Sequence, residues 1–416
     1  MQRTAGRRNL RLRAKFLTGA ALAALLIPVQ FAPALASGPG GVPASFALPG
    51  GAAPTYGAAA EIVSYVDLVH RSYEEAYDKA VAMKSAIGAL LDKPSEGNLA
   101  AAREAWIAAH VAYSRTEAFR FYEGPIDFAR NAKGDEGPEG RLNAWPLNEA
   151  FIDYVKGNPK AGIVNDLSIP ITVKSIRERD QVSDEADVTT GFHAVEFLLW
   201  GQDLSAKGPG ERPASDYASG DPVRERRRLY LSTVTEMIAD DLLWLTAQWD
   251  VRNANVYAKN FLAYDQRDAL GRILTGMATL GAVELATERM SVALDSGDQE
   301  DEPSCFSDTT HLVYRADQQS ISNVYFGEFG DWKGAGLQSL VARVDPELDK
   351  LVAAQIRKTS EAVAAIPAPV DRILASPKGS KERATMEKAI AELEAQSTLL
   401  VEVGKRLGVA VNIAPE

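Results

Sequence analysis

Apolar positions of this chain recur at intervals of three and four over most of its length. From Ile62 to Ile87 the spacing is that of one face of a long amphipathic helix. A second helix is predicted over 95–122, and Pro125 ends its pattern. From there to residue 185 glycines and prolines interrupt the spacing, apart from a short helical piece at 147–155. The N-terminal part of the chain is therefore predicted to be helical, with a long irregular insertion.

An almost wholly apolar segment, GFHAVEFLLW at 191–200, has the length of one short buried helix, closed by Gly201. A stretch rich in glycine, proline and alanine at 202–221 resembles a linker. Longer helices are then predicted over 223–249, 258–294, 337–365 and 381–407. No βαβ unit or run of strands is predicted. The expected fold class is all-α, with two helical-bundle halves packed side by side.

The first 36 residues have the pattern of an export signal. Six basic residues accompany an apolar run, and the small residues that end at Ala36 suit cleavage. We therefore expect a signal peptide over 1–36, cleaved after Ala36 and too short to span a membrane. Residues 37–60 lack periodicity and are predicted to be a flexible linker. The folded part is expected to divide into an N-terminal half at 61–222 and a C-terminal half at 223–416.

Removal of the signal peptide changes the charge balance. The whole chain carries −11, and the leader holds six bases and no acids, so the mature chain is six units more negative, at −17. Such a chain is expected to repel nucleic acid and anionic lipid and to attract cations, although the same charge also favours solubility. Cys305 is the only cysteine, so neither an intramolecular disulfide nor a lipid anchor at the cleavage site is expected. The mature protein is predicted to be periplasmic, with no nucleic-acid partner and no membrane anchor.

Two ionisable residues, His193 and Glu196, interrupt the apolar segment at 191–200. An unpaired charge there would cost roughly several kcal/mol, so the pair must be neutralised or ligated. Three positions apart on a helix, the two side chains share one face and would supply half of a metal site. Zinc peptidases use a second histidine, which this segment lacks. A core histidine bonded to a neighbouring acid is the alternative.

A second group of charged residues ends the helix predicted at 95–122. Glu117 and Arg120 follow an aromatic face that also carries His110. They form either a buried ion pair or a site in which Glu117 offers a carboxylate to a ligand. The C-terminal half repeats the pattern, again with paired charges as the alternative, in Glu284, Glu288 and Arg289.

The segment QEDEPSCFSDTTH at 299–311 combines an acidic run with three residues spaced by three, which are Cys305, Asp308 and His311. Acidic loops are usually solvated, and this spacing matches no metal motif. A lone thiol beside an aspartate and a histidine is less usual in an exported protein. Asp308 and His311 are therefore candidate site-lining residues.

Four blocks of the chain resemble the imelysin-like family, whose nominal activity is that of metallopeptidases. GFHAVEFLLWG at 191–201 resembles the family signature GxHxxE, and further blocks follow the family order at 116–127 and 143–155. The segment at 299–311, followed by NVYFGEF, is similar to the iron-regulated protein A branch. It departs from that branch by reading TTH where Asn-Thr-His is expected.

The resemblance implies an all-α, two-bundle fold in a periplasmic or envelope protein linked to iron uptake. It also implies that His193 and Glu196 are metal ligands and that Gly191 is the glycine of the motif. Glu117 is the conspicuous acid of the first block, and we take it as a third ligand. Residues expected to line the site are Arg120, Glu288, Asp308 and His311.

Three functions fit these residues. The leading hypothesis is a protein that binds iron and passes the iron to an envelope iron-transport protein. Zinc is the alternative metal, because imidazole and carboxylate ligands suit either metal. The second is a metallopeptidase in which a metal-activated water attacks a peptide bond. The third is a partner-binding component in which the polar pocket is structural.

Overall fold

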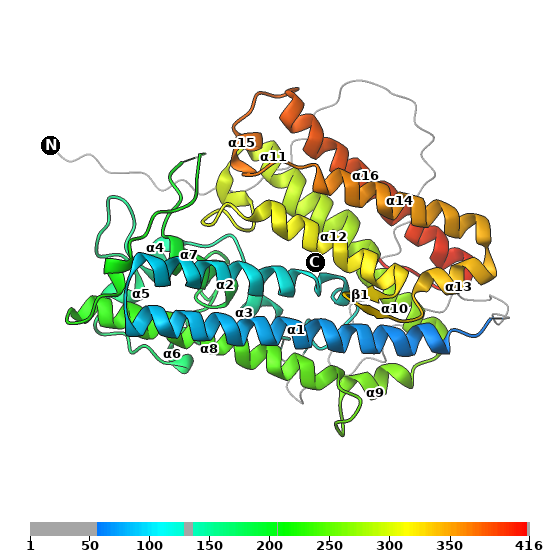
Figure 1. The fold of residues 1–416 in the computed structure, drawn as a ribbon, viewed down its shortest axis with the longest axis horizontal. Helices are drawn as coiled ribbons and strands as arrows, with labels where there is room; N and C mark the ends of the chain where they lie inside the picture. Colours follow the sequence, from blue (N-terminus) through cyan, green and yellow to red (C-terminus); the bar gives the residue numbers. More distant parts are fainter. Residues whose placement is uncertain (1–55, 129–135, 206, 414–416) are drawn as a thin grey trace. The chain divides into compact units, whose positions relative to one another are not determined.

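The computed structural model describes residues 56–128, 136–205 and 207–413. Within them the fold is almost wholly helical (Figure 1). The longer α-helices are α1 (Ala59–Asp92), α2 (Glu96–Ser114), α7 (Gly191–Trp200), α8 (Pro222–Trp249), α10 (Gln266–Thr279), α12 (Thr310–Phe326), α13 (Leu337–Val344), α14 (Pro346–Ala364) and α16 (Lys381–Leu407). The predicted signal peptide, its cleavage site and most of the predicted linker lie outside the described residues.

Short elements connect these helices. The short α-helices are α3 (Glu139–Asn143), α4 (Glu149–Ile152), α5 (Gly162–Asn165), α6 (Val173–Arg177), α9 (Tyr257–Leu262), α11 (Val292–Ser296) and α15 (Asp371–Leu374). Three 3₁₀ turns, η1 (Glu117–Phe119), η2 (Ala214–Tyr217) and η4 (Gln299–Asp301), and a π-helical segment, η3 (Leu280–Ser291), complete the helical part. Strands β1 (Glu328–Phe329) and β2 (Trp332–Lys333) form an antiparallel pair.

Helices α1, α2 and α8 form the first bundle, with α1 packed along both partners (Figure 1). The apolar face predicted from Ile62 to Ile87 is buried. Asp221 caps α8 by accepting hydrogen bonds from the backbone N of Val223 and of Arg224. The first bundle thus takes in a helix that the sequence division at residue 222 assigns to the C-terminal half.

Helices α10, α12, α14 and α16 and the segment η3 form the second bundle. The bundles meet where α12 contacts α2 and where α10 contacts α1. All described residues belong to one compact unit, Ala44–Glu416. The predicted fold class, all-α with two bundles side by side, is confirmed.

Helix α2 ends at Ser114, eight residues before the predicted end. Thr116 Oγ1 donates to the carbonyl oxygen of Tyr113 at 2.7 Å, and the chain turns into η1. Further on, Phe121 and Glu123 have positive φ angles, which a helix does not allow. The turn therefore carries Glu117 away from the face of α2 and against α10 and α12.

Two of the long predicted helices are divided. The pattern at 258–294 is interrupted by Asp265, whose side chain caps α10 by accepting from the backbone N of Arg267. The pattern at 337–365 is interrupted by Asp345 and Pro346, which begin α14. Aspartate is a favoured N-cap residue, and at Asp345 the proline that follows adds to the signal, so both breaks arise from local capping that apolar spacing does not reveal.

Helix α12 was not predicted from the sequence. Several of its buried positions are polar, namely Thr310, Asp317, Gln318, Ser320 and Asn323. Gln318 and Gln396 pair their amide groups at 2.8 and 3.0 Å across the interior of the second bundle. Because the inward face of α12 is polar, hydrophobic periodicity could not identify this helix.

The segments α10, η3 and α11 form one continuous helix, Gln266–Ser296, in which η3 is π-helical. Ser291 Oγ donates to the carbonyl oxygen of Ala286, five residues back. By length and composition this is the one described helix that could cross a membrane, yet 83% of its apolar window is buried inside the protein. We therefore regard it as a core helix. Such π segments occur often at functional sites.

Two stretches predicted to be linkers, 202–221 and the described end of 37–60, make specific contacts with the folded part. In the stretch 202–221, Arg212 is buried and donates to Asp153 at 2.8 Å, and Arg227 of α8 binds the same carboxylate. At the start of α1, Ala58 is buried and Tyr56 donates to the carbonyl oxygen of Leu407 at 2.6 Å. Both stretches are held in place by specific contacts.

Candidate functional site

Helix α7, which carries the GxHxxE pattern, is buried at all ten of its positions. Gly191 begins it with φ of +81°, and a Cβ atom there would lie 2.5 Å from the carbonyl oxygen of Leu142. Both the backbone conformation and the close approach require glycine. The glycine of the pattern therefore fixes where α7 starts, and with it the direction of the two polar side chains that follow.

His193 and Glu196 point to the same side of α7. His193 Nδ1 lies 2.9 Å from Glu196 Oε2, and the two residues are 2% and 0% exposed. His193 Nε2 has no hydrogen-bond partner. When the carboxylate is ionised, Nδ1 carries the proton and Nε2 presents a free lone pair.

Both oxygens of Glu196 are occupied. Oε1 accepts hydrogen bonds from the backbone N of Ser307 at 3.0 Å and from Ser307 Oγ at 2.6 Å, while Oε2 faces His193. The Ser307 hydroxyl also lies 2.7 Å from Thr309 Oγ1. A carboxylate held in this way orients an imidazole, as in carboxylate–histidine–metal arrangements. The geometry favours an orienting role for Glu196 over the direct ligand role expected from the sequence.

Burial sets the charge of this pair. It raises the pKa of Glu196 to about 8, although the hydrogen bonds from Ser307 act in the opposite direction. Burial lowers the pKa of His193 to about 3; the Arg289 charge lowers it further, and Glu117 partly offsets this. The imidazole is therefore neutral at physiological pH, whereas Glu196 is mostly protonated at that pH. The lone pair of His193 Nε2 is free to bind a metal in the state in which Glu196 is ionised and Nδ1 carries the imidazole proton.

A second histidine, His110 of α2, packs its ring 5.1 Å from the His193 ring in an edge-on arrangement. Its Nε2 lies 2.9 Å from Asn143 Oδ1, and its Nδ1 lies 3.5 Å from Ser304 Oγ. Burial, followed by the neighbouring His193, lowers its pKa well below the usual value. His110 is a neutral histidine with partners on both nitrogens, so it is better placed to support His193 than to bind a metal.

Glu117 lies in a buried network of charges that joins the two bundles. Its Oε2 accepts from Arg120 at 2.9 Å and from Arg289 at 2.7 Å, whereas its Oε1 has no partner. Arg289 also binds Glu284 at 2.9 Å and Asp317 at 2.9 Å. The predicted buried ion pair is present at Oε2, and Oε1 is the oxygen that could still be offered to a ligand.

The π-helical segment decides which acid of the C-terminal half enters this network. Glu284 and Arg289 stand five residues apart, and this spacing brings them together in η3. Burial raises the pKa of Glu284, but the charges of Arg289 and Arg120 outweigh it and hold the pKa below the usual value. Glu288, predicted to line the site, is exposed instead.

The segment 299–311 passes close to α7 through Ser307, while its other polar residues form a separate group. Asp308 lies near Asp203 and Asp371, and the His311 ring faces the backbone of Asp308. Cys305 is buried among acidic residues, and burial raises the pKa of its thiol well above the usual value. A thiol in this environment is unreactive.

Among the described residues, one group of three or more potential ligands has its ligand atoms all within 4.8 Å of one another. It consists of Asp203, Asp308 and Asp371. The ligand atoms of the predicted set, His193, Glu196 and Glu117, do not all lie within 4.8 Å of one another. Two of the aspartates were missed, because Asp203 lies in the linker-like stretch and Asp371 follows a proline-rich break.

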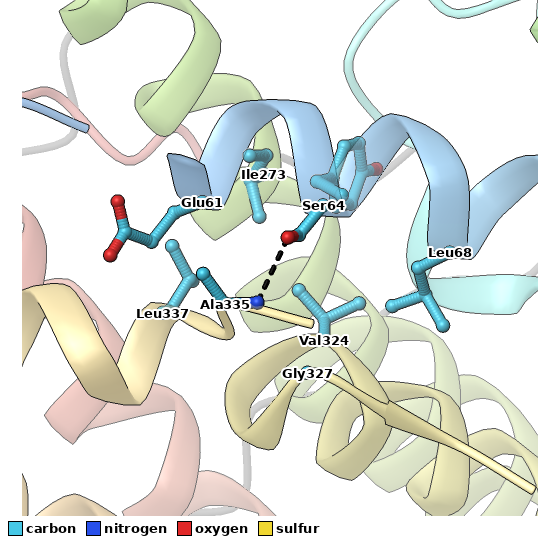
Figure 2. Close-up of a pocket in the computed structure, with 9 residues that line it drawn as sticks. Glu61, Ser64, Leu68, Ile273, Val324, Gly327, Ala335 and Leu337 are labelled. Carbon is cyan, nitrogen blue, oxygen red and sulfur yellow. Dashed lines mark hydrogen bonds between the residues drawn. The ribbon is translucent and has the colours of Figure 1, made fainter. Parts of the chain in front are cut away.

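A small pocket lies between the start of α1 and the loop that follows β2 (Figure 2). Ser64 Oγ accepts from the backbone N of Ala335 at 2.9 Å, and Glu61 binds Arg343 at 2.8 Å. Its volume of about 10 Å³ has room for about one water molecule. No predicted site residue lines this pocket, and its contacts serve to fasten the loop to α1.

Comparison with known proteins agrees with this architecture. The sequence profile of the imelysin family matches residues 69–400. Iron-regulated protein A of Synechococcus elongatus is 25% identical over 339 residues, which cover 79% of this chain and 82% of that protein.

Two crystal structures share the fold. One, described as an iron-regulated protein A precursor from Parabacteroides distasonis ATCC 8503, gives a TM-score of 0.63 at 21% identity and covers 86% of this chain and 97% of its own. The other, an imelysin-like protein from Psychrobacter arcticum 273-4, gives 0.59 at 15% identity, with 87% and 99% covered. Because the family profile spans most of the sequence, as the four blocks predicted, this chain belongs to the imelysin family.

Proposed function

We propose that this protein is an exported, periplasmic metal-binding protein of iron uptake, and that His193 Nε2 is its central metal-binding atom. One observation carries the proposal. A neutral, buried histidine is held at Nδ1 by Glu196, while its Nε2 has no partner. A buried polar atom without a partner is costly and needs an explanation, and a metal ion would supply one.

Glu117 Oε1 is the second buried atom that fits this role. It has no hydrogen-bond partner, and the Glu117 charge acts on His193. Arg289 lies in the same region, but its guanidinium is balanced by Glu117, Glu284 and Asp317. Imidazole and carboxylate donors suit iron, manganese and zinc. We choose iron because a relative covering most of the chain is named iron-regulated protein A.

The proposed location follows from the first 36 residues, whose basic start and apolar run are typical of a cleaved export signal. The intact mass of the exported protein measures it directly. Cleavage after Ala36 is expected, and a retained basic start would contradict a periplasmic location. A periplasmic iron-binding protein would pass its metal to an envelope transport protein, which we propose as its partner.

The metallopeptidase hypothesis fits the site less well. Peptide hydrolysis needs an open metal position and a carboxylate free to act as base. His193 is 2% exposed, and both oxygens of Glu196 are occupied. Glu117 would be the remaining base, with one oxygen already bound by two arginines. Hydrolysis of a peptide substrate by the metal-loaded protein, lost in Glu117→Gln, would favour this alternative.

The proposal is tested by metal analysis of protein purified from the periplasm, followed by calorimetric titration of the chelator-treated protein with ferrous iron and zinc. Wild type is expected to bind one metal ion at this site. His193→Ala should lose that binding and stay helical, whereas His70→Ala, a half-buried histidine elsewhere on α1, should bind normally. Unchanged binding in His193→Ala would contradict the assignment. Absence of metal from wild type would favour a structural, partner-binding role.

A further inference from the structure

Three aspartates from distant parts of the chain meet outside the His193 site. Asp203 follows α7, Asp308 precedes α12, and Asp371 begins α15. One carboxylate oxygen from each lies within 4.8 Å of the others, and Asp203 and Asp371 are 4% and 2% exposed. Like charges held this closely in the interior repel one another unless something neutralises them.

A fourth buried acid faces this group. Glu302 is 1% exposed, its carboxylate lies against Asp371, and the nearby Asp308 helps to raise its pKa. Six oxygens of the four acids have no hydrogen-bond partner. They are Asp203 Oδ2, Glu302 Oε1 and Oε2, Asp308 Oδ1, and Asp371 Oδ1 and Oδ2. Buried carboxylate oxygens normally accept hydrogen bonds, so this many free oxygens in one place indicate a missing positive partner.

The spacing suits a single cation. Calcium binds oxygen ligands at roughly 2.3–2.6 Å, so two of its ligands lie at most about 5 Å apart. The 4.8 Å limit that the three aspartates satisfy falls within this range. We infer that Asp203, Asp308 and Asp371, with Glu302 behind them, form a second metal site that binds a hard divalent cation such as Ca²⁺ or Mn²⁺ through oxygen alone.

The charges of the group agree with this inference. Burial, together with the neighbouring acids, raises the pKa of Asp203 to about 6 and that of Asp308 to about 7. The Arg372 guanidinium lowers the pKa of Asp308, and it also donates to the carbonyl oxygen of Lys207. One guanidinium cannot balance four carboxylates. Without a metal ion, the acids must share protons.

An acidic route leads to the group from the surface. A hollow of about 590 Å³ has Asp371 in its wall, and Asp298 and Glu300 line it as well. Burial and four neighbouring acids raise the pKa of Glu300 to about 8, which shows how negative this region is. A hydrated cation would be drawn into the hollow and would exchange water for carboxylate oxygen at its wall.

This site differs from the one proposed for iron in its donors and its access. It contains no imidazole, and it adjoins a surface hollow, whereas His193 is buried in α7. The two are linked through one segment, since Ser307, which holds Glu196, directly precedes Asp308. The inference does not depend on metal binding by His193.

The test is calorimetric titration of the chelator-treated full mature chain with CaCl₂ and MnCl₂, with thermal melts in parallel. Wild type should bind one equivalent and melt at a higher temperature with the cation. Asp371→Asn and Asp308→Asn should each weaken binding by at least about tenfold. Asp298→Asn is the matched control, because it removes an acid from the same hollow and keeps its cap on η4, and it should bind as wild type does.

His193→Ala separates the two proposals, because it should keep this binding even if it loses iron. Loss of cation binding in His193→Ala would overturn the inference of a separate site. The inference would also be overturned if wild type bound neither cation and its melting temperature rose only on acidification, because shared protons would then account for the cluster. Equal binding by wild type and Asp371→Asn would overturn it too.

Discussion

Ser307 donates both its backbone N–H and its hydroxyl to Glu196 Oε1, at 3.0 and 2.6 Å, although the two residues stand 111 positions apart. The segment that precedes α12 thereby fixes the carboxylate that orients His193. The GxHxxE helix and the segment 299–311, which both resemble blocks of the imelysin family, are therefore joined directly in the fold.

Ser307→Ala removes the hydroxyl donor and keeps the backbone donor. Loss of one buried hydrogen bond to a carboxylate should lower the free energy of unfolding by about 1–3 kcal/mol. Poorer orientation of His193 should weaken metal binding by about 10–100-fold. Chemical denaturation and metal titration measure the two effects. Ser85→Ala, which removes a hydroxyl bonded only to its own helix backbone, is the control and should change neither.

Glu196→Gln tests the pKa of Glu196, which is about 8 in the folded protein against an ordinary value of 4.5. Because the folded pKa is raised, this group stabilises the fold below pH 4.5, and the stability is lost as pH rises through 8. The loss is at most about 1.4 kcal/mol per pH unit. Glutamine cannot ionise, so the metal-free variant should lose less stability than wild type between pH 6.5 and 8.5.

The lowered pKa of His193 does not disturb this window, because a depressed histidine pKa costs stability only as pH falls below about 6.5. The acids around Asp371 are present in both proteins and cancel in the comparison. Urea denaturation at four pH values in the presence of chelator is the measurement. Parallel pH dependence of wild type and variant would contradict a raised pKa for Glu196.

Much of the fold could be predicted because it depends on local apolar spacing. The apolar face from Ile62 to Ile87 and the almost wholly apolar α7 are visible in the sequence, and the polar residues His193 and Glu196 stand out within α7. Helix α12 escaped prediction because its inward face pairs amides and carboxylates, as at Gln318 and Asp317. Polar groups buried as partners leave no periodic signal.

The site was less predictable because its parts come from distant positions. Asp203 and Asp371 are 168 residues apart in the sequence, and only the tertiary fold brings their carboxylates near Asp308. The choice of Glu284 over Glu288 depends on the π-helical turn, which shifts the inward face of the helix. A buried acid such as Glu302 looks in sequence like any other member of an acidic run.

Arg289→Met should destabilise the fold strongly. Arg289 is 1% exposed and binds Glu117, Glu284 and Asp317, and methionine would fill similar space without charge. Leaving these buried carboxylates without their partner should cost about 3–5 kcal/mol. Arg252→Met, at an exposed ion pair with Asp250, should leave the urea midpoint unchanged. Equal midpoints for both variants would show that the network is dispensable.

Gly191→Ala tests why the family motif begins with glycine. The φ angle of +81° is unfavourable for alanine, and the added Cβ would lie 2.5 Å from the carbonyl oxygen of Leu142, so the start of α7 must shift. We expect a loss of more than about 1 kcal/mol of stability. Gly88→Ala in α1, where a Cβ would meet nothing within 4 Å, should be neutral or stabilising. If Gly191→Ala kept full stability but lost metal binding, the glycine would serve the site and not the backbone, because a purely steric requirement lowers stability whether or not metal is bound.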